Sequence, residues 1–487
     1  MFKFIGQIRL YWWQTAVLVC IFGMTAFYAS YKLSESPPTW FDEGIYIQVA
    51  QSLAEGGVQT IQTAPGVVVS TGHVTGGYPF LGPIALSFKF FGNTLFAARL
   101  PMSVFIVLSV VVTFLLSYFL FGAYDALIAT FLLASFPVLY GSGKDVMGEV
   151  PGMFYTILTL CLVWKIEDTT YTKTRWWILA GLCAGLAAAT KPVFFLLPIA
   201  LAIIFLVRFR SWGPWRNIVW AVGAFSAPVL LWAYMQFGST DTLLAIFQHY
   251  ANPYEEVSIL GTVLHNLQSF FTQSTPLYCA VLMGLWLLAV SIRVCRKETL
   301  SFAEGAALIF SILIWLSYLR TAGWYRYFFE AMVLALIFAP SSLRIIAGTV
   351  FKKISLSRYV PAVSIIFVLL GAIQVYQLNF DSWVAEHYAS NQTKTFVAYF
   401  SQVPTTSVLV YDAPEIVPFL HSKNYYQYID LDPTQTLAYG KENLALLARG
   451  VPDQVIIPPH NYEQQKNLFT KYAQTDSVGS YLVLSRQ

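Results

Sequence analysis

The sequence predicts a multi-spanning α-helical membrane protein that ends in a small α/β domain outside the membrane. Two observations support this fold class. Of the 487 residues, 57% are hydrophobic and only 11% are Asp, Glu, Lys or Arg, whereas a soluble domain has about 25% charged residues. The charge is also uneven, because residues 381–487 are more polar than residues 1–380 and carry more acidic than basic side chains. We therefore expect a transmembrane module over 1–380 and an extracytoplasmic domain over 381–487.

The same composition excludes several classes of protein. The charge deficit excludes a disordered chain and an ordinary cytosolic enzyme, and it leaves membrane lipids as the main surroundings. The net charge of +4 is small and scattered, so we expect no nucleic-acid partner. The five cysteines lie in or beside apolar runs without the spacing of a metal site or a disulfide framework, and we interpret them as packing residues.

Eleven apolar runs approach the length of about 20 residues that a membrane-spanning helix needs. The first run could also be a signal peptide, but it is long and no clear small-residue cleavage site follows it, so we interpret it as the first span. The predicted spans are 11–31, 97–120, 124–141, 150–166, 176–190, 193–207, 217–237, 275–292, 302–319, 327–343 and 359–379.

The basic residues of the body predict the orientation of these spans. Every second loop is basic, and basic loops stay on the cytoplasmic side. With a cytoplasmic N-terminus, an odd number of spans places the tail outside, so we expect a multi-pass protein of the cell (inner) membrane with an extracytoplasmic C-terminal domain. The basic loop residues are Lys173, Arg175, Arg208, Arg210, Arg216, Arg293, Arg296, Lys297, Arg344, Lys352, Lys353 and Arg358.

Two long segments, about 32–96 and 238–274, then lie on the outer side. The first of them predicts a helix at the membrane surface, because an N-cap residue, an apolar stripe and a double glycine follow one another. These residues are Asp42, then Ile45, Val49 and Leu53, then Gly56 and Gly57.

The tail alternates short β-rich runs with helical stretches, which is typical of a small α/β domain. It has no glycine-rich phosphate loop, so nothing in it indicates nucleotide binding. We expect that deleting 381–487 leaves the membrane cavity intact and impairs acceptor selection. The β-rich runs are Ser407–Tyr411, Tyr426–Leu431, Asp453–Pro458 and Gly479–Leu484, and the helical stretches are Glu442–Arg449 and Tyr462–Tyr472.

Once the cytoplasmic charges are set aside, a small outward-facing set of ionisable residues is left. Carboxylates from two outer loops, with lysines and arginines at helix ends, would face one cavity at the membrane surface. Such a cavity suits an anionic lipid-linked substrate and a base that accepts a proton. The set is Asp42, Glu43, Lys89, Arg99, Lys144, Asp145, Glu149, Lys191, Arg320 and Arg326, with His73, His249 and His265.

The first outer loop resembles the signature of GT-C membrane glycosyltransferases, the relatives of protein O-mannosyltransferases and of the lipid A aminoarabinose transferase. The resemblance covers about residues 1–345, and four further stretches follow in the expected order. The first-loop signature is Trp40-Phe41-Asp42-Glu43-Gly44-Ile45-Tyr46 with Ala50, Leu53 and Gly56-Gly57. The other stretches are 75–91 with Ala98-Arg99-Leu100, Gly148-Glu149-Val150-Pro151, Gly185-Leu186 with Thr190-Lys191-Pro192, and Trp324-Tyr325-Arg326-Tyr327.

This resemblance implies a GT-C fold and a polyprenyl-phosphate-linked sugar as the donor, with transfer to a lipid, protein or glycan acceptor on the outer face. Asp42 matches the first-loop carboxylate that acts as general base, normally with inversion at the anomeric carbon. The alternative is that Asp42 only caps a helix. Glu43 would assist in the same site or orient Tyr46, and a solvated first-turn carboxylate is its alternative.

The resemblance also implies roles for the second outer loop and for the cations. Glu149 matches the second-loop acidic residue, where Asp is more usual, and Asp145 is the rival for this role; a plain first-turn carboxylate is the alternative. Lys191 fits a phosphate ligand, or else a lysine that reaches the membrane interface. Arg326 sits where relatives bind the lipid phosphate, with Tyr325 and Arg320 as neighbours. An interfacial arginine is the alternative for Arg326.

Metal use varies among relatives, so a divalent metal ion is one conceivable cofactor, beyond which no cofactor is expected. His249 and His265 occupy the outer loop where one relative places a zinc-binding histidine, but no HxxH or HExxH spacing is present. Two other functions compete with sugar transfer. A transporter or flippase of a lipid-linked sugar would favour polar groups near mid-membrane, and a scaffold would leave Asp42, Glu149 and Lys191 without a shared purpose.

Overall fold

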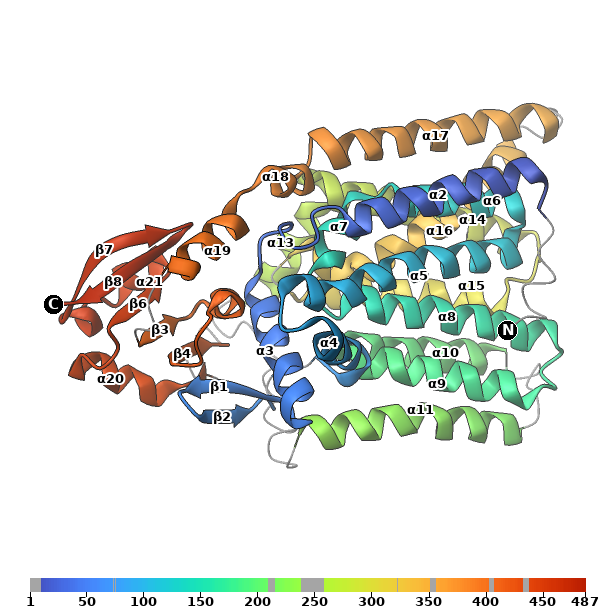
Figure 1. Cartoon of the computed structure of the whole chain (residues 1–487). Helices are drawn as coiled ribbons and strands as arrows, with labels where there is room; N and C mark the ends of the chain where they lie inside the picture. The colour runs from blue at the N-terminus through green and yellow to red at the C-terminus, as the bar shows by residue number, and fades with distance from the viewer. Residues whose placement is uncertain are drawn as a thin grey trace.

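Apolar helices fill the first three quarters of the computed structural model and run side by side, with a mixed α/β domain at one end (Figure 1). The structure describes residues 10–72, 74, 76–208, 215–237, 258–321, 323–350, 356–402, 407–431 and 438–487, with side chains in the stretch from 356 described only from 363 onward. His73, Arg210, His249, Lys352 and Lys353, and the side chain of Arg358, are outside this set.

Within the described residues, eleven helices coincide with the eleven predicted spans, which confirms the helical membrane fold. Those with 19 to 27 residues are long enough to cross a membrane. The bundle helices are α2 (Trp12–Ser30), α5 (Leu95–Phe121), α6 (Ala123–Ala134), α8 (Glu149–Asp168), α9 (Thr174–Thr190), α10 (Leu196–Val207), α11 (Trp215–Gln236), α14 (Ser274–Cys295), α15 (Phe302–Tyr318), α16 (Phe329–Val350) and α17 (Leu356–Phe380).

Not every one of these helices passes a test of length and composition. Seven pass it alone, and the pair α6 and α7 (Pro137–Lys144), bent by 55° at their junction, passes it together. The other three bundle helices, α9, α10 with its leading turn η1 (Pro192–Phe195), and α15, are shorter. The predicted spans therefore fall in the right places, but several are shorter than a full membrane crossing.

The end of the bundle next to the C-terminal α/β domain carries the first long segment between spans. It forms α3 (Phe41–Gly56), the hairpin β1 (Thr60–Ala64) and β2 (Val67–Ser70), and α4 (Tyr78–Phe91). Part of the second long segment forms α13 (Ile259–Thr272). The predicted helix after residue 40 is confirmed, and Gly57 ends it in the left-handed conformation with φ of 71°.

The C-terminal domain (residues 381–487) begins with α18 (Trp383–Ala389) and α19 (Gln392–Gln402) and is built around a six-stranded sheet of order β5-β4-β3-β6-β8-β7. The central pairs β3–β4 and β3–β6 are parallel, and the others are antiparallel. Its strands are β3 (Val408–Tyr411), β4 (Tyr425–Asp430), β5 (Ala438–Tyr439), β6 (Gln454–Ile457), β7 (Tyr472–Val478) and β8 (Tyr481–Arg486).

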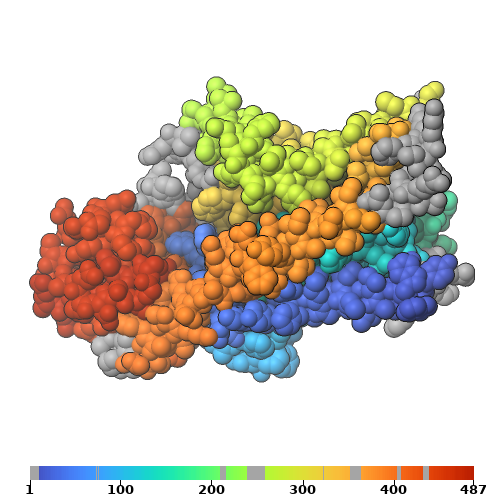
Figure 2. All heavy atoms as spheres, turned by 90° about the horizontal axis from the view of Figure 1, so that it is seen from above, coloured from blue at the N-terminus to red at the C-terminus, as the bar shows by residue number. Residues whose placement is uncertain are grey.

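Short helices cover this sheet, and one of them touches the membrane module. They are η4 (Pro414–Phe419), η5 (Lys441–Asn443), α20 (Leu444–Arg449), α21 (Pro459–Gln464) and η6 (Lys466–Phe469). The α/β character of the tail is confirmed. Seen from above, the domain projects from one end of the elongated bundle, and α2 and α17 lie together along its flank (Figure 2). The side chains of Tyr28 and Asn379 hydrogen-bond between these two helices.

The surroundings of α3 differ from those predicted for a helix at the membrane surface. Residues 43–50 are all buried, because α3 lies between one end of the bundle and the C-terminal domain (Figure 1). Gly44 marks the contact: a Cβ atom at this position would lie 2.4 Å from backbone atoms of Pro414 and Glu415 in η4. The helix α3 is thus packed between the bundle and the C-terminal domain.

Candidate active site

The start of α3 sets the direction of two acidic side chains. Trp40 is the residue before the helix, and the Glu43 carboxylate accepts a hydrogen bond of 3.3 Å from its backbone N–H. Asp42 lies in the first helical turn, so the prediction that it is the N-cap is wrong. Because successive residues on an α-helix are about 100° apart, Asp42 and Glu43 enter different surroundings.

Asp42 pairs with an arginine from a distant part of the sequence. The Nη1 atom of Arg326 donates to Asp42 Oδ2 at 2.8 Å. The Arg326 side chain is 15% exposed and the Asp42 side chain 35% exposed, so the carboxylate is still accessible to a second molecule. Arg326 belongs to η3 (Tyr325–Phe328), the turn that leads into α16.

A second carboxylate–cation pair lies beside the first. Glu149 begins α8, Lys191 follows the last residue of α9, and the Lys191 ammonium lies 2.5 Å from Glu149 Oε1. The Glu149 side chain is 3% exposed and that of Lys191 is 21% exposed. The two residues are therefore held together at adjacent ends of neighbouring helices, on the side of the bundle where α3 lies.

The two pairs form one charged cluster. Arg326 interacts electrostatically with Glu149 as well as with Asp42. Burial would lower the pKa of the Lys191 ammonium, but the charge of Glu149 and, more weakly, that of Asp42 raise it above its ordinary value. Two acidic and two cationic side chains from four helix ends thus share one partly open, low-dielectric site.

Glu43 lies in a separate buried cluster. Its carboxylate accepts from Arg99 Nε and Nη2, each at 2.7 Å, and from the backbone N–H of Val146 at 3.2 Å. The side chains of Glu43 and Arg99 are both 0% exposed. This forked pair fastens the first turn of α3 to α5 and to the segment before α8.

Asp145 joins the Glu43 cluster, with its Oδ1 atom 3.5 Å from Arg99 Nη2. Burial, and next the charge of Glu43, raise the pKa of the Asp145 carboxyl well above its usual range. Nearby, the Lys144 ammonium donates to the carbonyl of Tyr31 at 2.8 Å and lies over the ring of Tyr388. Of the two rivals for the second-loop role, only Glu149 has a direct contact with a cation of the Asp42 cluster.

The remaining predicted binding residues lie at different depths. Tyr46 is buried, and its ring packs edge-on against Phe80 at 5.3 Å between centroids. Tyr325 lies 3.5 Å from the Ser142 hydroxyl and packs against Trp383. Arg320 is exposed after the end of α15. The structure thus brings Asp42, Glu149, Lys191 and Arg326 together.

Three residues near the cluster are absent from the predicted set. Glu330, in the first turn of α16, is 1% exposed, lies within electrostatic range of Glu149 and Lys191, and its Oε2 atom has no hydrogen-bond partner among the described residues. A single acid inside an apolar run is the signal that could have identified it. The rings of Trp324 and Tyr327 flank the Arg326 guanidinium at 4.8 and 5.2 Å.

Among the described residues, the charged cluster does not provide the donor set of a metal centre. In the part of the chain that the structure describes, no three His, Cys, Asp or Glu side chains come close enough to hold an ion. Asp42 and Glu149 each bind a cationic side chain instead. His265 is exposed on α13, and His249 lies outside the described residues. We therefore derive no chemical step through a metal.

The fold was compared with solved structures. Crystal structures of ArnT from Cupriavidus metallidurans align over nearly the whole chain; the one bound to undecaprenyl phosphate has a TM-score of 0.63 at 14% identity and covers 96% of this chain and 98% of that one. The archaeal oligosaccharyltransferase AglB from Archaeoglobus fulgidus, in complex with an inhibitory peptide and a dolichol-phosphate, has a TM-score of 0.58 at 14% identity and covers 98% of this chain and 74% of that one. At 14% identity these matches show that the chain shares the fold of these proteins.

Parts of the sequence also match known proteins. Residues 80–232 match the family of dolichyl-phosphate-mannose-protein mannosyltransferases. The undecaprenyl phosphate-alpha-4-amino-4-deoxy-L-arabinose arabinosyl transferase of Pseudomonas aeruginosa is 29% identical over 175 residues, and that of Pseudomonas paraeruginosa matches to the same extent. These matches cover 35% of this chain and 31% of each relative, which is about a third of the relatives' length.

Proposed function

We propose that the chain transfers a sugar from a polyprenyl-phosphate donor to an acceptor on the outer face of the membrane. The observation that carries this proposal is the charged cluster of Asp42, Arg326, Glu149 and Lys191 at four outer helix ends. A partly exposed carboxylate beside two cations suits a reaction in which a hydroxyl or amine loses a proton while a phosphate departs. Because the cluster lies at helix ends rather than at mid-span, it favours transfer over transport.

The donor phosphate is bound by Arg326 and Lys191. Arg326 uses Nη1 for Asp42, while its buried Nε has no hydrogen-bond partner among the described residues. A guanidinium presents donors in a fixed fork that matches phosphate oxygens, so Arg326 can hold the phosphate without leaving Asp42. Lys191 adds a second positive charge on a flexible stem.

Asp42 is the general base. Its carboxylate takes the proton of the acceptor nucleophile, which forms a bond to the anomeric carbon of the donor. The bond from that carbon to the phosphate oxygen breaks at the same time, and its electron pair leaves with the polyprenyl phosphate. Arg326 and Lys191 stabilise the negative charge that develops there. Attack opposite to the leaving group inverts the anomeric centre.

Glu149 is a positioning residue in this scheme rather than the base. It is nearly fully buried and holds the Lys191 ammonium in place. Glu43 has a structural role, because both of its oxygens bind Arg99 and the backbone. Both assignments refine the sequence-based prediction that these acids take part in catalysis.

The same geometry supports the proposed topology. The predicted cytoplasmic basic residues Lys173, Arg208 and Arg293 lie at the end of the bundle opposite to α3, where Arg208 and Arg293 pair with Glu167 and Glu304. With these residues in the cytoplasm, the cluster and the C-terminal domain lie outside the inner membrane. The donor would enter from the lipid, and the acceptor, a lipid, protein or glycan, from the outer side.

Comparison of cells with and without the gene tests the proposal. Mass spectrometry of lipids and glycans should show one sugar substituent that disappears when the gene is deleted. The intact gene should restore it, and a gene encoding Asp42→Asn should not, although the variant protein reaches the membrane in equal amount. Full restoration by Asp42→Asn, or no missing sugar in the deletion strain, would contradict the proposed function.

A further inference from the structure

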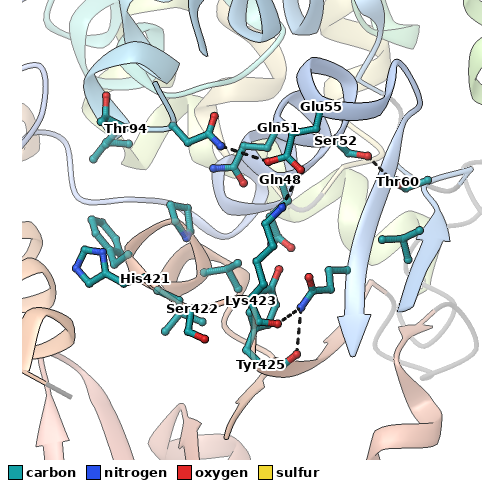
Figure 3. Close-up of a pocket in the computed structure, with 18 of the residues that line it drawn as sticks. Gln48, Gln51, Ser52, Glu55, Thr60, Thr94, His421, Ser422, Lys423 and Tyr425 are labelled. Atoms are coloured by element: carbon teal, nitrogen blue, oxygen red, sulfur yellow. Dashed lines mark hydrogen bonds and ion pairs between the residues drawn. The ribbon is translucent and has the colours of Figure 1, made fainter. Parts of the chain in front are cut away.

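A cavity lies along the second half of α3, beyond the turn that carries Asp42. It has a volume of about 980 Å³ and is open on one side. Figure 3 shows its walls: the second half of α3, the start of β1, and the loop from His421 to Tyr425 of the C-terminal domain. Ligand pockets usually have about 300–1,000 Å³, so this cavity is large enough for an extended ligand.

The walls are held in place by interactions between the two domains. The Lys423 ammonium lies 2.8 Å from Glu55 Oε2, and the Gln62 side chain donates to the carbonyl of Lys423 at 2.8 Å (Figure 3). The hydroxyls of Ser52 and Thr60 lie 2.5 Å apart and tie α3 to β1. These contacts therefore fix the shape of the cavity at the domain interface.

Other polar groups of the cavity are available to a ligand. The side chains of Ser34, Gln51 and His421 line it, and none of them has a hydrogen bond to a described residue. Amides and hydroxyls can each offer both donors and acceptors, and an imidazole also forms hydrogen bonds. Apolar side chains, among them Phe96 and Val68, lie between these polar groups.

We propose that this cavity binds a neutral oligosaccharide. Sugar hydroxyls are donors and acceptors at once, so they match the amide and hydroxyl groups of the walls, while the C–H faces of sugar rings suit the apolar patches. An anionic ligand is disfavoured because Lys423 already pairs with Glu55 and no arginine lines the cavity. An extended peptide would add to a free strand edge, but β1 is paired with β2 and also fastened to the C-terminal domain through Gln62.

This site is separate from the charged cluster. On α3, Gln48, Gln51 and Glu55 line the cavity, and helix geometry places them about 120° to 180° around the helix from Asp42. The proposal thus concerns a second carbohydrate site built jointly by α3 and the C-terminal domain. It is independent of sugar transfer, because binding here needs neither donor nor turnover.

The test is a binding measurement with the full chain in detergent micelles on an array of neutral and acidic oligosaccharides. We expect retention of neutral oligosaccharides. Gln51→Trp, which fills the cavity, should abolish retention, and His421→Ala, at an exposed position, should weaken it about three- to tenfold through the loss of one hydrogen bond. Gln464→Trp is the matched control, because Gln464 is exposed and lies outside the cavity.

Three results would overturn the proposal. The first is that the chain retains no neutral oligosaccharide, or acidic ones alone. The second is that Gln51→Trp and His421→Ala both bind as the unaltered chain does. The third is that binding survives in Gln51→Trp but is lost in Arg326→Lys, which would assign the sugar to the charged cluster instead.

Discussion

The central feature at the scale of single residues is that each acid of the cluster is matched by a cation from another helix. Asp42 and Arg326 are 284 positions apart in sequence and form a hydrogen bond of 2.8 Å. In our proposal the donor phosphate shares that arginine, so donor binding and activation of the base are coupled.

This coupling predicts that Arg326→Lys is not a conservative change. A lysine keeps the charge but offers a point charge instead of a fork, so it cannot hold Asp42 and the phosphate together. We expect about tenfold weaker binding of undecaprenyl phosphate, which corresponds to one lost charge-assisted hydrogen bond. The measurement is the dissociation constant of the purified chain in detergent.

Arg296→Lys is the control for this change. Arg296 is 40% exposed at the other end of the bundle and hydrogen-bonds to Thr349, so its replacement should leave lipid binding unaltered. Equal affinity in Arg326→Lys and the unaltered chain would remove Arg326 from the phosphate site.

The sequence identifies most residues of the cluster but not their partners. Charges are rare in the apolar body, so Asp42, Glu149, Lys191 and Arg326 stand out by composition and by their motifs. Which acid meets which base depends on how four helix ends pack, and that information is not local. For the same reason the sequence does not separate Glu43, which pairs with Arg99, from Asp42 beside it. Glu330 is missed because it lies within a predicted span.

At the scale of elements, the contact between α3 and η4 links the membrane module to the C-terminal domain. The close packing at Gly44 predicts that this contact does not tolerate a larger side chain at that position. A methyl group at Gly44 would meet the η4 backbone at 2.4 Å, whereas at Gly56 of the same helix the nearest atom is 3.6 Å away, on the Val58 side chain. Gly44→Ala should therefore lower the melting temperature and reduce transfer.

Gly56→Ala is the matched control, because a helical glycine replaced by alanine without a clash gains up to about 1 kcal/mol. It should leave the melting temperature equal or higher. If thermal unfolding showed the same melting temperature for Gly44→Ala and Gly56→Ala, the close packing of α3 on η4 would be disproved.

Glu415 in η4 predicts that the stability of the fold depends on pH. Burial raises the pKa of its carboxyl from 4.5 to about 7, and its Oε1 atom accepts a hydrogen bond from the Tyr481 hydroxyl. Between these two values the folded chain binds a proton that the unfolded chain releases. Stability therefore falls as the pH rises through this window, by up to about 3 kcal/mol.

The measurement is the melting temperature at pH 5 and at pH 8. In Glu415→Gln the fall between the two should be smaller than in the unaltered chain, because glutamine does not titrate and can still accept from Tyr481. Glu442→Gln, at an exposed position, should retain the full fall. An unchanged pH response in Glu415→Gln would refute the role of Glu415.

Elements were predictable where their signal is local. Runs of apolar residues locate all eleven bundle helices, and four β-rich runs of the tail coincide with β3, β4, β6 and β8. The hairpin of β1 and β2 is missed because it is short and stabilised by contact with the C-terminal domain, as in the hydrogen bond from Gln427 to the Gln62 carbonyl. In place of the predicted helix 462–472, the structure has two short helices, α21 and η6. The strand β7 begins at Tyr472, because its residues pair with β8.

At the scale of the whole molecule, the C-terminal domain covers the helix that carries the proposed base. The contact at Gly44 and the hydrogen bond of 2.8 Å between Gln48 and Gln427 link the two parts. This changes the sequence-based expectation that the tail is dispensable for the cavity. A chain ending at residue 380 should lose transfer by at least about 100-fold while donor binding falls less, because removal of η4 leaves the buried face of α3 open to water.

Donor binding and transfer should be measured side by side on this truncated chain, reconstituted in nanodiscs. The matched comparison is a full chain carrying Gln464→Trp on the distant surface of the domain. Transfer by the truncated chain at the rate of the full chain would show that the domain does not support the cavity.

The most direct test of the central claim is to compare donor binding with turnover in Asp42→Asn, using purified full chain in lipid nanodiscs and the donor lipid identified by the cell experiment. If Asp42 is the general base, the variant should bind the donor with nearly unaltered affinity, and transfer should fall by about 10² to 10⁴-fold, the usual contribution of a general base. Transfer at a near-normal rate would contradict the claim, and so would a loss of activity that weaker donor binding explains in full.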